Sequence, residues 1–136
     1  MNFIKTFESF NKNIDDEFIE GVLKGYLGSA LWTAELDKYG VEDFDEQDIN
    51  KAKKEVEYFL YDMNSKGYLE HLQDKLEPFV IGHNYWLTRN GHGTGFWDQS
   101  ELNQEIADKV SDVLRKNYKE IPDPVYNEAT NKVEFY

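Results

Sequence analysis

Residues 82–98 carry the densest set of chemically useful side chains in the sequence. This glycine-rich segment holds two of the three histidines, an arginine, two asparagines, two tryptophans and an aspartate. A histidine that exchanges protons near neutral pH, a cation that holds an anionic group and a carboxylate that orients the imidazole are the parts of a small acid–base site. Four residues are therefore candidates for catalysis: His83, Arg89, His92 and Asp98.

The same segment also has two non-catalytic interpretations. As a scaffold, its glycines permit positive φ, Asn90-Gly91 makes a turn, and the tryptophan rings cover neighbouring helices. Arg89 would then pair with an acid or stack on a tryptophan, and Asp98 would cap a helix. As a binding loop, the segment would present five residues to a ligand or partner: Trp86, Arg89, Asn90, His92 and Trp97.

No metal or cofactor is predicted for this segment. His83 and His92 alone leave a divalent ion short of ligands, and a chain without cysteine has no sulfur-based zinc site. The loop at residues 91–95 is rich in glycine but lacks the lysine and the following helix of nucleotide-binding loops. Any chemistry of the segment therefore depends on its own side chains.

A second candidate surface is acidic. The 27 acids exceed the 15 bases and give a net charge of −12, which opposes binding to a phosphate backbone. Many of these acids lie in residues 35–48, and four of them form the predicted acidic face: Glu42, Asp43, Asp45 and Glu46. This charge favours a basic or neutral protein partner and argues against direct binding of nucleic acid.

Size and composition predict a single domain spanning residues 1–136. The chain is 40% hydrophobic and 15% aromatic, which is enough for one packed core. The apolar residues of segment 3–10 share one face of a helix, so residues 1–13 are expected to be an amphipathic amino-terminal segment that can detach from the domain. No apolar run reaches the roughly 20 residues of a membrane span, and the absence of cysteine favours a reducing compartment.

Helical periodicity predicts most of the elements that position these residues. Three main helices are expected, with these limits: Asp15 or Asp16 to about Trp32, Asp45 or Asp48 to about Met63, and Asp98 to about Asn117. Each begins at an acidic cap and continues with apolar residues three and four positions apart. Glu101 stands at capping-box spacing from Asp98. A further turn over residues 68–72 continues the second helix or kinks away from it.

The remaining segments predict β-structure. Residues 79–97 combine aromatic and β-branched residues with several glycines, which is typical of two strands joined by a loop. Residues 125–136 follow two prolines and alternate around a turn at 128–131, with three inward-facing candidates: Val125, Val133 and Phe135. The predicted fold class is α+β, with about three main helices packed on a small antiparallel sheet or hairpins.

The stretch from Gly82 to Asp98, Gly-His-Asn-Tyr-Trp-Leu-Thr-Arg-Asn-Gly-His-Gly-Thr-Gly-Phe-Trp-Asp, resembles a family of small, acidic proteins encoded by tailed bacteriophages. The likeness extends more loosely to residues 18–21, to residues 30–32 and to the final hairpin. Members of that family often carry an acid and a phenylalanine at the positions of Asn84 and Tyr85, and an arginine at that of Gln99. The resemblance implies a phage source and the family's fold, and it brings no established activity.

The leading hypothesis is a phage accessory protein, not an enzyme, that binds a host or phage protein in the host cytoplasm and inhibits a host nucleic-acid enzyme or defence system. The alternative is a small enzyme or ligand-binding protein that uses the loop carrying the four catalytic candidates. A further alternative is an internal protein packaged in the virion, since residues 4–10 are similar to amino-terminal segments of large-phage proteins, including some that direct cargo into the prohead. The sequence leaves the oligomeric state open.

Overall fold

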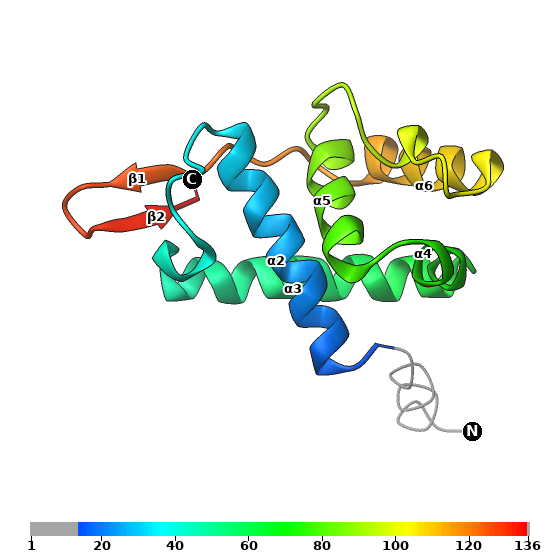
Figure 1. The fold of residues 1–136 in the computed structure, drawn as a ribbon, viewed down its shortest axis with the longest axis horizontal. Helices are drawn as coiled ribbons and strands as arrows, with labels where there is room; N and C mark the ends of the chain where they lie inside the picture. Colours follow the sequence, from blue (N-terminus) through cyan, green and yellow to red (C-terminus); the bar gives the residue numbers. More distant parts are fainter. Residues whose placement is uncertain (1–13, 136) are drawn as a thin grey trace.

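Five α-helices and one two-stranded antiparallel sheet make up residues 14–135, the part of the chain that the computed structural model describes (Figure 1). In chain order they are α2 (Asp16–Thr33), α3 (Glu46–Ser65), α4 (Leu69–Lys75), α5 (Pro78–Arg89), α6 (Gln104–Asn117), β1 (Val125–Asn127) and β2 (Lys132–Glu134). Two 3₁₀ turns lie in the connections: η1 (Val41–Asp43) and η2 (Phe96–Asp98). The predicted α+β class is confirmed, with five helices in place of about three. The amphipathic segment predicted at residues 3–10 lies outside the described residues.

The helices α2 and α5 form the centre of the fold, where they run side by side in the same direction (Figure 1). Two glycines allow their backbones to touch. A Cβ atom on Gly25 would overlap the carbonyl oxygen of Phe79, and a Cβ atom on Gly82 would overlap that of Val22. Glycine is therefore required at both positions because any side chain would push the helices apart.

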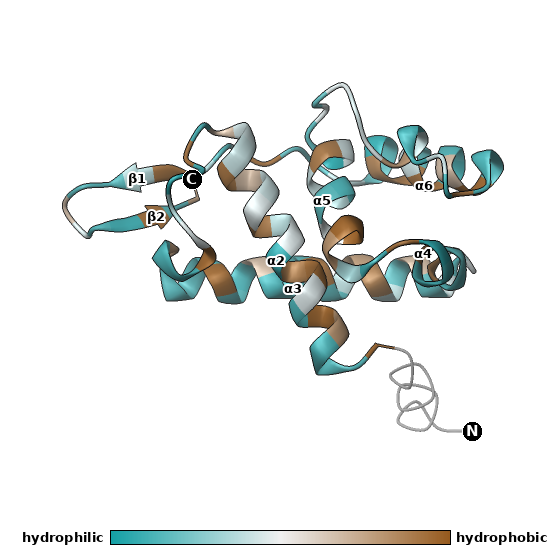
Figure 2. Ribbon diagram, viewed as in Figure 1, coloured by the Kyte–Doolittle hydropathy of each residue, from teal (hydrophilic) through white to brown (hydrophobic). Residues whose placement is uncertain are grey.

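The long helix α3 runs across α2 and α5 and supplies much of the core. The rings of Phe59 on α3 and Tyr85 on α5 stack with their centroids 4.1 Å apart, and Val56, Leu60 and Met63 are buried along the same helix. Figure 2 shows apolar residues on the helix faces that meet other elements and polar residues on the outer faces. No helix within residues 14–135 is long and apolar enough to cross a bilayer.

The predicted caps of the first two helices are confirmed. The Asp15 carboxylate accepts a hydrogen bond from the Phe18 amide at 2.8 Å, and the Asp45 carboxylate accepts one from the Gln47 amide at 3.1 Å. Both bonds satisfy amides that the first turn of a helix leaves without partners. After α3, Gly67 adopts a φ of 81°, and α4 begins as a separate helix.

The prediction of two strands within residues 79–97 is wrong, because the first part of this segment is helix α5. Glu77 is extended, as expected before a proline, but Pro78 then occupies the first turn of the helix, where its missing amide costs nothing. Packing against α2 and α3 outweighs the strand preference of the aromatic and β-branched residues. The glycine turn follows only after the helix, at Gly91 and Gly93, whose φ angles are 66° and 79°.

The predicted start of the last helix at Asp98 is also wrong. Asp98 ends the 3₁₀ turn η2, and the cap of α6 is Asn103, whose side-chain oxygen accepts hydrogen bonds from the amides of Glu105 and Ile106 at 2.8 and 3.3 Å. The capping-box spacing of Asp98 and Glu101 is therefore coincidental. The end of this helix at Asn117 agrees with the prediction.

The predicted hairpin at the carboxyl end is confirmed. Its strands pair in the register Val125–Glu134, Tyr126–Val133 and Asn127–Lys132. Val133 is buried as expected, whereas Val125 is 38% exposed, contrary to the prediction that it faces inward. The hairpin attaches to the start of α3, where the Asp45 amide donates to the Val133 carbonyl at 2.9 Å. The core is thus built by helices on helices with the small sheet beside it, so the predicted packing of the helices on the sheet is wrong.

Candidate functional site

The predicted catalytic candidate Arg89 is a buried structural cation. It is 8% exposed, and its guanidinium donates to the Lys119 carbonyl at 2.7 Å, the Glu55 carboxylate at 2.8 Å and the Tyr85 hydroxyl at 3.0 Å. Burial raises the pKa of the Tyr26 and Tyr85 phenols, so both stay neutral beside it. The pairing with an acid is confirmed. The alternative offered for Arg89, stacking on a tryptophan, does not occur, since the guanidinium lies over the Tyr85 ring.

His83 lies half-buried where α2 and α5 meet. Its Nδ1 atom shares a hydrogen bond with the Ser29 hydroxyl, and its ring lies 5.9 Å from that of Trp32, centroid to centroid. Burial lowers the pKa of the imidazole because the charged form loses solvation. These contacts favour a neutral ring that joins the two helices.

The remaining residues of the segment separate into buried anchors and exposed loop. Trp86 is fully buried, and its indole N–H donates to the Thr33 hydroxyl at 2.9 Å. Asn90 is half-buried and accepts a hydrogen bond from the Ile121 amide at 2.8 Å, which ties the loop to the chain after α6. Trp97 is half-buried under the guanidinium of Arg115, 4.3 Å from its ring centroid.

His92 and Asp98 are exposed. Of the four catalytic candidates, only His92 lines the hollow between Trp32 and the glycine-rich loop. Arg89 is enclosed in the core and His83 is engaged with Ser29. The structure thus does not bring the four side chains together around one hollow. Within residues 14–135, no group of three or more potential ligands is placed to hold a metal ion.

The predicted acidic face is only partly available to a partner. The Asp43 carboxylate accepts a hydrogen bond from the Gly40 amide at 2.8 Å, and Asp45 caps α3, so both serve the local backbone. Glu42 and Glu46 are exposed, and Glu42 borders a hollow beside Phe79. The accessible negative charge lies chiefly elsewhere.

Among the described residues, the structure exposes three large aromatic side chains that the sequence did not single out, Tyr58 on α3 and a pair at the contact of α2 and α5. Trp32, at the end of α2, is 57% exposed, and Phe79, near the start of α5, is 52% exposed. Both lie over the contact of the two helices, since a Cβ atom added to Gly28 would stand 3.6 Å from the Phe79 ring, and the Trp32 ring lies beside that of His83. We call this exposed surface, centred on Phe79 and Trp32, the seam face.

A sequence signal for the seam face exists in α2. Gly21, Gly25 and Gly28 follow one another at helical spacing, and Trp32 continues the same line. Small residues along one line of a helix allow another helix to approach closely, so the aromatic residue at the end of that line stands beside the contact. Phe79 could not be found in this way because its segment was assigned to a strand.

Three neighbouring hollows occupy the seam face. The first, beside the start of α2, has a volume of about 530 Å³. The second, of about 430 Å³, shares Phe79 and Lys24 with the first. The third, also of about 430 Å³, shares Asp37 with the second. Among the described residues that line the three hollows, Lys24 is the one lysine, and seven carry carboxylates: Asp15, Glu17, Glu20, Glu35, Asp37, Glu42 and Glu77. The exposed rings are therefore set in a strongly acidic surround.

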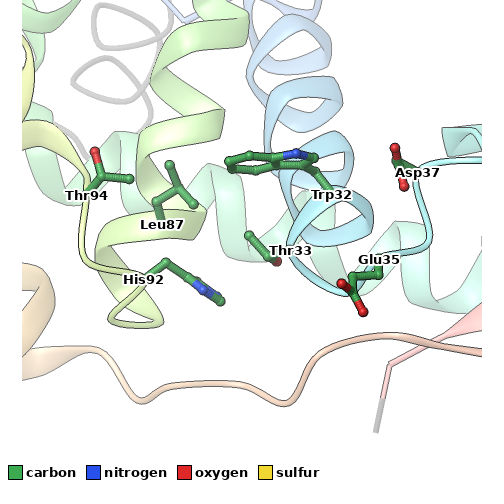
Figure 3. Close-up of a pocket in the computed structure, with 7 residues that line it drawn as sticks. All are labelled: Trp32, Thr33, Glu35, Asp37, Leu87, His92 and Thr94. Carbon is green, nitrogen blue, oxygen red and sulfur yellow. The ribbon is translucent and has the colours of Figure 1, made fainter.

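The third hollow lies between the end of α2 and the glycine-rich loop, and we call it the Trp32 hollow (Figure 3). The Trp32 indole borders it on one side. The carboxylates of Glu35 and Asp37 lie toward one end, and His92 extends from the loop at the other. The residues that line it are Trp32, Thr33, Glu35, Asp37, Leu87, His92 and Thr94.

Comparison of the chain with models of known protein families, with curated proteins and with solved structures found no match in any of the three. The function of the seam face must therefore be argued from its own shape and charge.

Proposed function

We propose that this protein acts by binding another protein through the seam face, and that the partner presents a basic surface. The observation that carries the proposal is the pair of exposed aromatic residues, Phe79 and Trp32, set among seven carboxylates and a single lysine in the lining of the three hollows. Aromatic side chains supply much of the binding energy of protein interfaces, while the surrounding charge selects and steers the partner.

The resemblance of residues 82–98 to tailed-phage proteins extends this proposal. A phage accessory protein in the host cytoplasm meets host enzymes whose basic surfaces bind nucleic acid, and an acidic face with aromatic anchors is suited to occupy such a surface. Inhibition of a host nucleic-acid enzyme or defence system is the function we infer. The phage source and the host target remain predictions that rest on the resemblance.

A small enzyme built on the four catalytic candidates is less well supported. Arg89 is committed to Glu55 and Tyr85 within the core, and His83 is half-buried against Ser29. A substrate would therefore meet His92 without a fixed cation or an orienting carboxylate from the predicted set. The geometry favours a scaffold role for most of the glycine-rich segment.

A pull-down from a lysate of a bacterial host tests the proposal. The protein would be immobilised as wild type and as Phe79→Ala, Trp32→Ala and Tyr58→Ala variants. Tyr58 is the matched control because it is 64% exposed, on α3, and lines none of the three hollows. We expect wild type and Tyr58→Ala to retain the same protein at low salt, and both seam-face variants to lose it.

Salt supplies the second part of this test. The retained protein should elute between about 0.1 and 0.5 M NaCl, since the Debye length falls below about 10 Å in this range. Equal retention by all four baits would contradict the seam face as the binding surface. Retention that is insensitive to salt would contradict a basic partner.

A further inference from the structure

The Trp32 hollow combines a flat aromatic surface with two carboxylates. Trp32 is more than half exposed, and Glu35 and Asp37 border the same hollow of about 430 Å³ (Figure 3). Its volume lies near the lower end of the range of about 300–1,000 Å³ that is usual for ligand pockets. The hollow is thus large enough for one long side chain of a partner.

The two carboxylates form no ion pair with the described residues, although Asp37 also borders the neighbouring hollow that Lys24 lines. Among residues 14–135, no salt bridge involves Glu35 or Asp37, and no lysine or arginine lines the Trp32 hollow. Lys38, which follows Asp37 in the sequence, has its ammonium group over the Tyr39 ring, 5.2 Å from the ring centroid. The negative charge of the hollow is therefore available to a cation from outside.

The backbone holds Glu35 in an uncommon conformation. Its φ is 60°, in the left-handed region, at the position after α2 that glycine usually occupies. The Leu36 amide donates to the Leu31 carbonyl at 2.8 Å and closes the helix end. A glutamate at this position places a carboxylate at the hollow that glycine would not provide.

We propose that the Trp32 hollow receives one arginine side chain of the protein partner. This inference rests on the proposed function, because it names the group of the partner that the seam face recognises. The guanidinium is planar and weakly hydrated, so it stacks on an indole while its edge donates to carboxylates. An ammonium group can make the ion pairs but not the same stacking contact. Glu35 and Asp37 accept from the guanidinium, and Trp32 covers its face.

A titration followed by NMR tests the assignment on the whole chain. The indole N–H signal of Trp32 would be identified with a Trp32→Phe variant, and the protein titrated with N-acetyl-arginine amide, N-acetyl-lysine amide and N-acetyl-citrulline amide. Citrulline has nearly the shape of arginine but no charge. We expect a saturating shift of the Trp32 signal with the arginine compound, a weaker response to lysine, and none to citrulline.

Three variants locate the site. Glu35→Gln and Asp37→Asn should each weaken the arginine response by up to about fivefold, the upper end for an ion pair between exposed side chains. Glu42→Gln is the control, since Glu42 borders the neighbouring hollow but not this one, and it should leave the response unchanged. An equal response to citrulline, an equal or stronger response to lysine, or an equal loss in Glu42→Gln would overturn the proposal.

The two proposals fail in different ways. If the Trp32 signal does not respond to arginine while Phe79→Ala still abolishes retention of a partner, the seam face stands and the arginine site is wrong. If arginine binds at Trp32 but no bait retains a protein through Phe79, the arginine site stands and the wider protein-binding role is wrong.

Discussion

At the scale of single residues, burial decides which charges are free to act. The side chain of Arg89 is 6% exposed, whereas that of its partner Glu55 is 42% exposed. Neutralising the carboxylate leaves the cation in the core without a counter-charge, and neutralising the cation leaves the carboxylate partly in water. The two changes should therefore lower the free energy of unfolding by different amounts.

We expect Glu55→Gln to lower the free energy of unfolding by about 3 kcal/mol, because a buried charge without its partner is strongly destabilising. Adding Arg89→Met to that variant should recover part of the loss, since the unpaired charge is then removed. Urea unfolding of wild type, both single variants and the double variant measures this. A double variant less stable than Glu55→Gln would show that the hydrogen bonds of Arg89 matter more than its charge.

The tryptophans and the loop histidine differ in a measurable way. Trp86→Ala should cost about 3–5 kcal/mol, because it removes a fully buried ring and leaves a cavity. Trp97→Ala should cost less, since Trp97 is half-buried, and His92→Ala should cost least, since His92 is exposed. The midpoints of urea unfolding give this order. A His92→Ala variant as unstable as Trp86→Ala would contradict the exposed position of His92.

Glu35 links stability to the arginine site. Glu35→Gly should raise the free energy of unfolding by up to about 1 kcal/mol, because glycine adopts a φ near 60° without steric cost. Glu35→Ala is the control and should not gain, since alanine meets the same backbone strain. If the proposed site is correct, the more stable glycine variant binds arginine less well. A glycine variant no more stable than wild type would refute strain at this position.

At the scale of elements, the contact between α2 and α5 depends on glycine in a position-specific way. Gly25→Ala should destabilise the protein by several kcal/mol or prevent folding, because the new Cβ would overlap the Phe79 carbonyl and the backbones cannot separate without opening the core. Gly28→Ala is the matched control in the same helix. Its Cβ would lie at ordinary contact distance from the Phe79 ring, 3.6 Å away.

The control should be as stable as wild type, or slightly more so, because alanine favours helix over glycine by about 0.5–1 kcal/mol. Circular dichroism and thermal unfolding of the two variants measure the contrast. Two variants of equal stability would show that α2 and α5 do not touch through their backbones at Gly25.

The elements differ in how far the sequence could predict them. The limits and caps of α2 and α3 followed from local information, namely an acidic cap and apolar residues at helical spacing. Helix α5 did not, because the need for Gly82 comes from Val22 on another helix, and no local pattern records that contact. Asp98 and Asn103 are both acceptable caps by type, and the 3₁₀ turn before α6 decided between them.

The candidate site was harder to predict than the fold. The sequence indicated an acidic and aromatic binding surface, and Glu42 and His92 do border hollows of the seam face. The anchors Trp32 and Phe79 were not predicted, because the exposure of an aromatic ring depends on which helices cover it. A dense polar segment in the sequence can equally serve core contacts, as Arg89 and Asn90 illustrate.

At the scale of the whole molecule, the net charge of −12 predicts opposite effects of salt on folding and on binding. Like charges repel one another in the folded chain, so screening should raise the thermal midpoint between about 10 and 200 mM NaCl while it weakens a complex with a basic partner. Neutralising the exposed acids Asp112 and Glu128 should make the midpoint less sensitive to salt. A midpoint that falls with salt would mean that attractive pairs dominate.

The pairing of α2 with α5 has a consequence for the order of folding. In the chain, α3 and α4 stand between the two helices, so the glycines of the central contact meet only after this long intervening segment has been closed into a loop. The entropy of that closure is lost before the contact contributes any stability. Bundles in which neighbouring helices of the sequence pack together avoid this delay and fold fast. In this chain the central contact joins two helices that are far apart in the sequence. We therefore expect the folding rate to depend on this long-range encounter, and a chain whose elements are reordered so that a linker joins α2 directly to α5 should shorten that search.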